Sequence, residues 1–133
     1  MKKIIVLTTL ILLTGCSKTL TCTSKGSSET STITQTYKIN YEENTVKNIK
    51  VEKTYKFEDE TVFNNFKNIL NYTVESKNNE NISASYKEKN KKYILSEKYN
   101  VEKLDAETLT QNGLSSDLEQ LKQILENNGL ECK

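Results

Sequence analysis

The segment STITQTYKINY (residues 31–41) alternates between two kinds of side chain along most of its length. Ile33, Tyr37 and Ile39 fall on one side of an extended chain, and threonines and Lys38 fall on the other. A two-residue period of this kind is typical of a β-strand that buries one face and leaves the other in water. The segment therefore predicts a half-buried strand with which neighbouring segments can pair.

The segments on both sides repeat this alternation. Residues 46–57 follow a polar turn at 42–44 and carry aliphatic or aromatic side chains on one side of the chain. Residues 19–24 alternate in the same way and precede a glycine-containing turn at 25–28. Short turns between alternating segments join antiparallel neighbours. The sequence therefore predicts an antiparallel meander of three strands with one face in water.

The hydrophobic period changes to that of a helix at Glu58. The acidic cluster Glu58–Glu60 stands where carboxylates favour the positive end of a helix dipole. These features predict an amphipathic helix from Asp59 to Val74. The residues that form its apolar stripe are Val62, Phe63, Phe66, Ile69 and Leu70.

Two further strands follow the predicted helix. After a polar break at residues 77–81, the segments 82–87 and 93–101 alternate again, and we expect them to pair through a turn at residues 90–91. Residues 104–113 have no clear period, and one helical turn is the most that we expect there.

The last predicted element is a second amphipathic helix with marked ends. Ser116 and Glu119 have the spacing of a capping box, which satisfies free backbone N–H groups at a helix start. Gly129 suits the left-handed residue after a helix, and Leu130 can then fold back on Leu125. We therefore expect a helix that begins after Ser116 and ends before Gly129.

The order of the predicted elements is βββαββα. Strands and helices that segregate in this way are typical of an α+β fold. We expect a single domain over residues 19–133, in which an antiparallel sheet of about five strands has two helices packed on one face. The other face should be polar and open to water.

The N-terminus has the features of a bacterial lipoprotein signal. Lys2 and Lys3 precede an apolar run at residues 4–13, which is too short to span a membrane, and the run ends in the lipobox Leu13-Thr14-Gly15-Cys16. We expect residues 1–15 to be removed as a signal peptide. An ordinary secretory signal with a chance cysteine is the alternative.

The lipobox also predicts how the mature chain is attached. Cys16 would carry a diacylglyceryl group with acyl chains such as palmitate, and two acyl chains anchor a protein stably. Residues 16–18 would then form a short lipidated tether. The predicted location is the extracytoplasmic face of the cell membrane.

The composition narrows the possible functions. The chain has 133 residues with 19 lysines, 18 carboxylates and no histidine, and it also lacks arginine, proline and tryptophan. Removal of Lys2 and Lys3 leaves 17 lysines against 18 carboxylates, which argues against nucleic acid as a partner. Without histidine, the usual proton shuttle at neutral pH and the imidazole metal ligand are missing. We expect no cofactor, no metal ion and no catalytic residue.

Cys22 and Cys132 remain when Cys16 is lipidated. An even pair of cysteines outside the cytosol favours a disulfide, and closing so long a loop would stabilise the fold by about 4 to 5 kcal/mol. Two independent cysteines in the core are one alternative. A catalytic cysteine is another, and only a lysine could then lower its pKa.

The chain resembles small bacterial lipoproteins of the YehR-like type. The resemblance lies in the lipobox, the alternating hairpin at residues 37–57, the acidic helix start at 58–60 and the ending over 121–133. It covers most of the mature chain and implies a location and a fold. Only the lipidated Cys16 carries over as a functional residue.

The leading functional hypothesis is a tethered, non-catalytic interaction module. Its polar sheet face, or a groove between helices and sheet, would hold an unidentified envelope protein or polymer. A small-ligand carrier or sensor subunit is the second hypothesis, and a hydrolase without histidine is the third. A deep apolar pocket would favour the carrier, and a buried cluster of perturbed carboxylates or lysines would favour the enzyme.

Overall fold

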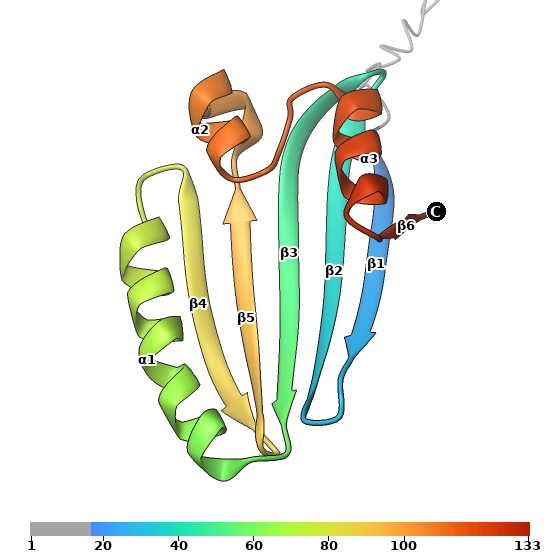
Figure 1. The fold of residues 1–133 in the computed structure, drawn as a ribbon. Helices are drawn as coiled ribbons and strands as arrows, with labels where there is room; N and C mark the ends of the chain where they lie inside the picture. The colour runs from blue at the N-terminus through green and yellow to red at the C-terminus, as the bar shows by residue number, and fades with distance from the viewer. Residues whose placement is uncertain (1–16) are drawn as a thin grey trace, which may run out of the picture.

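The computed structural model describes residues 17–133, which form an antiparallel sheet with helices on one side (Figure 1). The strand order is β4-β5-β3-β2-β1-β6. The strands are β1 (Lys18–Ser27), β2 (Ser31–Glu42), β3 (Thr45–Phe57), β4 (Ile82–Lys89), β5 (Lys92–Tyr99) and β6 (Glu131–Cys132). The predicted α+β class is confirmed.

The strand register separates an inner face from an outer face. Ile49 of β3 pairs with Ile39 of β2 and with Tyr99 of β5, and all three side chains are buried. The residue that follows Ile49 is Lys50, which is exposed. Because side chains alternate along a strand, the same register fixes both faces over the whole sheet.

The helices all lie on the inner side of the sheet. They are α1 (Glu60–Lys77), α2 (Ala106–Gln111) and α3 (Leu118–Asn127), with a short 3-10 turn at Val101–Lys103. Helix α1 runs beside β4, and α3 lies over β2 and β1 toward the end where the described chain begins (Figure 1). Each helix therefore covers its own part of the sheet.

Two hydrophobic clusters fill the space between helices and sheet. The larger one lies beneath α2 and α3 and includes Leu121, which is fully buried. The smaller one lies beneath α1, where Phe63 stacks on Tyr93 with ring centroids 4.3 Å apart. Tyr93 and Leu95 belong to the smaller cluster and Tyr99 to the larger, so β5 joins the two.

The number of elements differs from the prediction. The sheet has six strands because Glu131–Cys132 pairs with β1 at Thr23 and Cys22. Two residues are too few to show a period, so this strand left no pattern in the sequence. The predicted single turn near residue 106 is a helix of six residues, so the described part of the chain has three helices where two were expected.

The helix ends also correct one prediction. Asp59 caps α1 by accepting a hydrogen bond from Val62 N, close to the expected start. Asp117, one residue after the expected Ser116, caps α3 by accepting from Gln120 N at 2.8 Å. A short carboxylate is as good a cap as a serine hydroxyl, so the sequence offered two neighbouring choices.

The C-terminal end of α3 is as expected. Gly129 has a φ of 86°, and Leu130 N donates to Leu125 O at 3.0 Å. This hydrogen bond turns the chain back toward the sheet, where Leu130 is buried and β6 can pair with β1.

Candidate functional site

The outer face of the sheet carries exposed lysines among small hydroxyl side chains. Within residues 17–133, no helix covers this face (Figure 1). The register brings lysines from five strands onto it, and all of them are exposed. This lysine face consists of Lys25, Lys38, Lys50, Lys56, Lys87, Lys89, Lys92 and Lys98.

Two rows place lysines opposite one another on adjacent strands. Lys50 of β3 pairs with Lys38 of β2 on one side and with Lys98 of β5 on the other. In a second row, Lys56 pairs with Lys92. Like charges that face each other directly destabilise a sheet. Fold stability therefore does not account for these rows, which concentrate positive charge on a surface open to water.

Carboxylates are sparse on this face. Glu52 lies between the two lysine rows and pairs with Thr36 and Ser96. Glu42 and Glu131 stand at the margins, next to the first hairpin and on the edge strand. The centre of the lysine face therefore has a strong excess of positive charge.

Two hollows indent the lysine face. The first has a volume of about 260 Å³ and lies around the row of Lys50. The second has a volume of about 230 Å³ and lies around Lys56. The side chains that border the first hollow include Thr36, Lys38, Lys50, Glu52, Ser96 and Lys98. Those that border the second are Lys25, Thr32, Thr34, Thr54, Lys56 and Lys92.

A larger hollow of about 530 Å³ lies along the exposed side of α3 and is bordered by several carboxylates. Both carboxylate oxygens of Asp117, which borders this hollow, accept hydrogen bonds from within the protein. Its Oδ1 caps α3, and its Oδ2 accepts a 2.7 Å hydrogen bond from Asn44 in the turn between β2 and β3. The position of Asp117 is therefore explained by helix capping.

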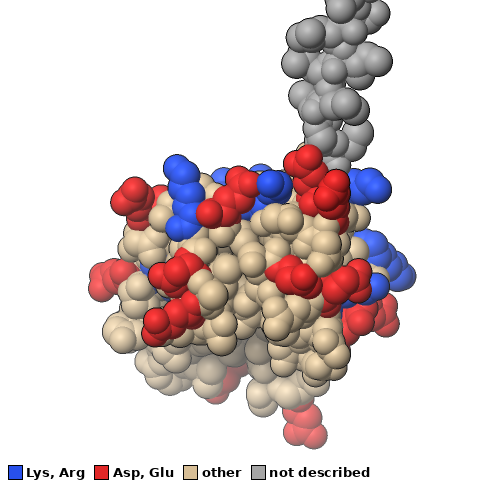
Figure 2. Space-filling view, turned by 90° about the horizontal axis from the view of Figure 1, so that it is seen from above, with Lys and Arg blue, Asp and Glu red and all other residues tan. Residues whose placement is uncertain are grey.

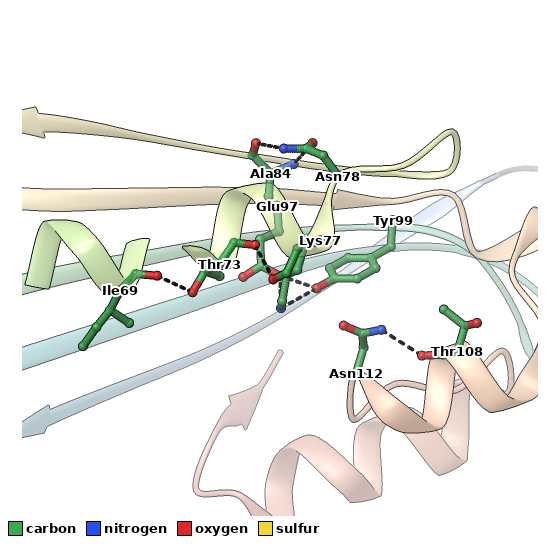
Figure 3. A network of polar contacts seen from close by, with 10 residues as sticks. Ile69, Thr73, Lys77, Asn78, Ala84, Glu97, Tyr99, Thr108 and Asn112 are labelled. Atoms are coloured by element: carbon green, nitrogen blue, oxygen red, sulfur yellow. Dashed lines mark hydrogen bonds and ion pairs between the residues drawn. The ribbon is translucent and has the colours of Figure 1, made fainter. Parts of the chain in front are cut away.

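A compact ion pair lies on the inner face, where the two hydrophobic clusters meet (Figure 3). Glu97 of β5 is 2% exposed, and its Oε2 accepts a 2.9 Å hydrogen bond from Lys77 Nζ at the end of α1. The Tyr99 hydroxyl donates to the same oxygen. Lys77 also donates to that hydroxyl at 3.1 Å and lies 5.9 Å from the centroid of the Tyr99 ring.

These contacts set the ionisation of the buried groups. Burial alone would raise the pKa of Glu97, but hydrogen bonds from Tyr99 and Lys77, with the charges of Lys77 and Lys53, hold this pKa below its ordinary value. Burial lowers the pKa of Lys53, although the Glu97 charge opposes that change. Burial raises the pKa of Tyr37, and the negative charge of Glu97 raises it further. Glu97 is therefore a buried, ionised carboxylate.

The ion pair fits a structural role better than a catalytic one. A carboxylate that acts as general acid or base needs a pKa near the working pH and must reach its substrate. Glu97 has a lowered pKa and is almost completely buried. Its Oε1 has no hydrogen-bond partner among residues 17–133, so Lys77 and Tyr99 provide the contacts that compensate for burying this charge.

Asn78 closes part of the free edge of the sheet (Figure 3). Its side-chain amide donates to Ala84 O at 2.9 Å and accepts from Ala84 N at 2.8 Å, as a neighbouring strand would. An edge that is capped in this way cannot pair with another strand at that point. This contact favours the faces of the sheet over the β4 edge as binding surfaces.

The structure describes two of the three cysteines, Cys22 and Cys132. Cys22 and Cys132 form the predicted disulfide, which joins β1 to β6 across a sequence separation of 110 residues. Cys16 and the expected signal peptide lie outside the described residues. None of the helices between residues 17 and 133 has the length and apolar character that a bilayer crossing requires.

The sequence indicated the outward lysines one strand at a time but not the rows that they form. Lys38 occupies a predicted outward position, and only the register shows that it lies in one row with Lys50 and Lys98. The buried Glu97 was missed. Its position in phase with Leu95 and Tyr99 was the available signal, because it placed a carboxylate on the apolar side of a strand.

Comparison with known proteins gives evidence about the fold of this chain and none about its function. No known protein family matches the chain, and no curated protein is similar to it at the level that would indicate common descent. The solved NMR structure of a protein from Streptococcus pneumoniae TIGR4 has a similar fold, with a TM-score of 0.52 and 15% sequence identity. The match covers 88% of this chain and 85% of that chain. The chain therefore has a fold seen in a streptococcal protein, and its likeness to YehR-like lipoproteins stays a prediction.

Proposed function

We propose that this protein is a membrane-anchored, non-catalytic binding module of the bacterial cell envelope, and that its lysine face holds an envelope component. The observation that carries the proposal is the row of Lys38, Lys50 and Lys98, which face one another across three strands. Such a row opposes folding and lies on a face that no described helix covers. A binding role accounts for both facts.

The anchor in this proposal is the diacylglyceryl group expected on Cys16. Strand β1 begins at Lys18, so Ser17 alone separates the lipidated residue from the sheet. A tether of this length keeps the domain next to the bilayer. The lysine face would then meet components that lie close to the membrane.

The alternatives have less support. A carrier of small apolar molecules needs an apolar pocket, whereas the hollows on the lysine face are bordered mainly by lysines and hydroxyl groups, with Glu52 beside the first. A hydrolase would require a reactive group that substrate can reach, and the buried ion pair of Glu97 with Lys77 does not meet that need. An interaction module remains the hypothesis that the geometry favours.

Site-specific photocrosslinking in the native host tests this function. A photoreactive amino acid replaces Lys50 on the lysine face and, in a matched control, Lys67 on the exposed side of α1. We expect adducts that depend on light from position 50 and few from position 67. An adduct with a polymer is identified by its loss on treatment with enzymes that degrade that polymer. Equal labelling at both positions would contradict the proposal.

The predicted anchor is tested separately. A Cys16→Ser variant should move from the membrane fraction to the soluble fraction, because it cannot accept the diacylglyceryl group. Membrane retention of this variant would contradict the lipoprotein assignment. It would leave the crosslinking result at position 50 unaffected.

A further inference from the structure

We infer that the lysine face binds a linear polymer with repeated anionic groups, and that separate anionic groups of one polymer chain occupy the two hollows. This inference rests on the proposed function and adds the chemical class of the partner. Its basis is the pairing of charge with hydrogen-bond donors in each hollow, and the distance between the hollows along the sheet.

Each hollow combines ammonium groups with hydroxyl groups. Lys50 and its two partners surround the hydroxyls of Thr36 and Ser96 in the first hollow. The second hollow has three lysines, including Lys56, around the hydroxyls of three threonines, including Thr34. An ammonium group attracts phosphate or carboxylate as a point charge, and a hydroxyl adds a donor. The second hollow has no carboxylate on its border, whereas Glu52 borders the first, so an anionic group in the first hollow is expected at the Lys50 row and away from Glu52.

The spacing of the hollows indicates a long ligand. Lys50 and Lys56 lie on the same face of β3 and are six residues apart in the sequence. A strand rises about 3.3 Å per residue, so the two rows are separated by roughly 20 Å. A single small anion cannot reach both. A chain with repeated charges can, and its second contact then benefits from the high effective concentration created by the first.

Glu52 borders the first hollow on the side that faces the second. It lies between the rows of Lys50 and Lys56, and its carboxylate is exposed. An anionic group placed directly above it would be repelled. The anionic groups of a bound chain are therefore expected over the lysine rows on either side of Glu52.

The charge of the tethered end favours a polymer over the bilayer itself. Viewed from the end where the described chain begins, carboxylates are spread across the surface, and lysines lie toward its margins among further carboxylates (Figure 2). Anionic lipids in the bilayer that carries the anchor would repel the carboxylates of this end, which disfavours contact between the lysine face and that bilayer. Glu43 lies in the turn between β2 and β3 at this end, and Asp117 is held beside the same turn by its hydrogen bond from Asn44.

Binding of inorganic polyphosphate to the full mature protein in neutral detergent tests the inference. One polyphosphate sample has chains shorter than the roughly 20 Å between the rows, and the other has longer chains. The variants are Lys50→Gln and Lys56→Gln, one for each hollow, with Lys67→Gln on α1 as the control that removes the same charge elsewhere. A fourth variant, Glu52→Gln, removes the repelling carboxylate. Unfolding midpoints of all variants confirm that each is folded.

The inference makes a distinct prediction for each variant. The long chains should bind at least about tenfold more tightly than the short ones. Lys50→Gln and Lys56→Gln should each weaken binding of the long chains by about fivefold, the effect of removing one lysine near an anionic surface. Glu52→Gln should strengthen it, and Lys67→Gln should leave it unchanged. Affinity should fall as salt is added.

Three outcomes would overturn the inference. Equal affinity for short and long chains would remove the two-subsite arrangement. If Lys50→Gln and Lys67→Gln weaken the binding of long polyphosphate equally, the net charge of the protein alone attracts the polymer. Tighter binding to vesicles of anionic phospholipid than to long polyphosphate would identify the bilayer as the ligand of this face.

The failure of this inference can be told apart from the failure of the proposed function. If polyphosphate does not bind but the photoreactive group at position 50 still labels an envelope protein, the lysine face is a binding surface with a different kind of partner. If position 50 labels nothing beyond the position 67 control, the proposed function fails as well.

Discussion

The two faces of this sheet are made by alternate residues of the same strands. Ile39, Ile49 and Tyr99 form a buried row on the inner face, and the residues one step away form the lysine row on the outer face. The inner row contacts the larger hydrophobic cluster, whereas the outer row contacts water. The inner face therefore determines stability, and the outer face can be specialised for binding without changing the core.

The largest expected effect concerns the disulfide on the inner face. A Cys132→Ala variant should lose about 5 kcal/mol of unfolding free energy in the chain-entropy treatment, because the bond closes a loop of 110 residues. Urea unfolding of the oxidised protein and the variant measures this loss. Wild-type protein unfolded in the presence of a reductant is the control and should show a similar loss. An unchanged urea midpoint in both would contradict the prediction.

A smaller loss is expected when the buried ion pair is broken. Lys77→Met removes the ammonium group and leaves Glu97 ionised and buried, which should cost about 3 kcal/mol. The double variant Lys77→Met with Glu97→Gln should recover part of this loss, because it buries no charge. Chemical unfolding of both proteins at neutral pH measures the difference. If the single variant is as stable as wild type, the ion pair has no role in the fold.

The same ion pair predicts a pH dependence. The folded-state pKa of Glu97 is lowered from 4.5, so ionised Glu97 stabilises the fold at pH values above the pKa of the unfolded chain. This contribution should be lost as the pH falls through the lower, folded-state pKa. The stability difference between wild type and Glu97→Gln should therefore shrink on acidification below about pH 4.5. A difference that stays constant down to pH 2 would contradict this assignment.

The smallest effect is expected on the outer face. Lys50→Gln relieves repulsion from Lys38 and Lys98, so its unfolding free energy should equal that of wild type or exceed it by about 0.5 kcal/mol. Added salt should reduce any gain, because it screens charges exposed to water. Lys67→Gln on α1 is the matched control. A loss above about 1 kcal/mol in Lys50→Gln would show that the lysine face also supports the fold.

The sequence alone was sufficient for most of the secondary structure. The alternation in residues 31–41 and 46–57 predicted β2 and β3, and the change of period at Glu58 predicted α1. These patterns are local, because burying one face of a strand or a helix repeats within a few residues. The two-residue strand β6 was not predictable, since two residues are too few to show a period and its pairing with β1 is a contact between distant segments.

What the sequence determined by itself is the side of each strand on which a lysine lies, because alternation along a strand is a local property. Only the tertiary structure decided which lysines became neighbours, since strand register depends on contacts between distant segments. Lys50 and Lys98 are far apart in the chain and opposite each other in the sheet. The meeting of Lys77 with Glu97 had the same origin, because it required α1 to pack across β5.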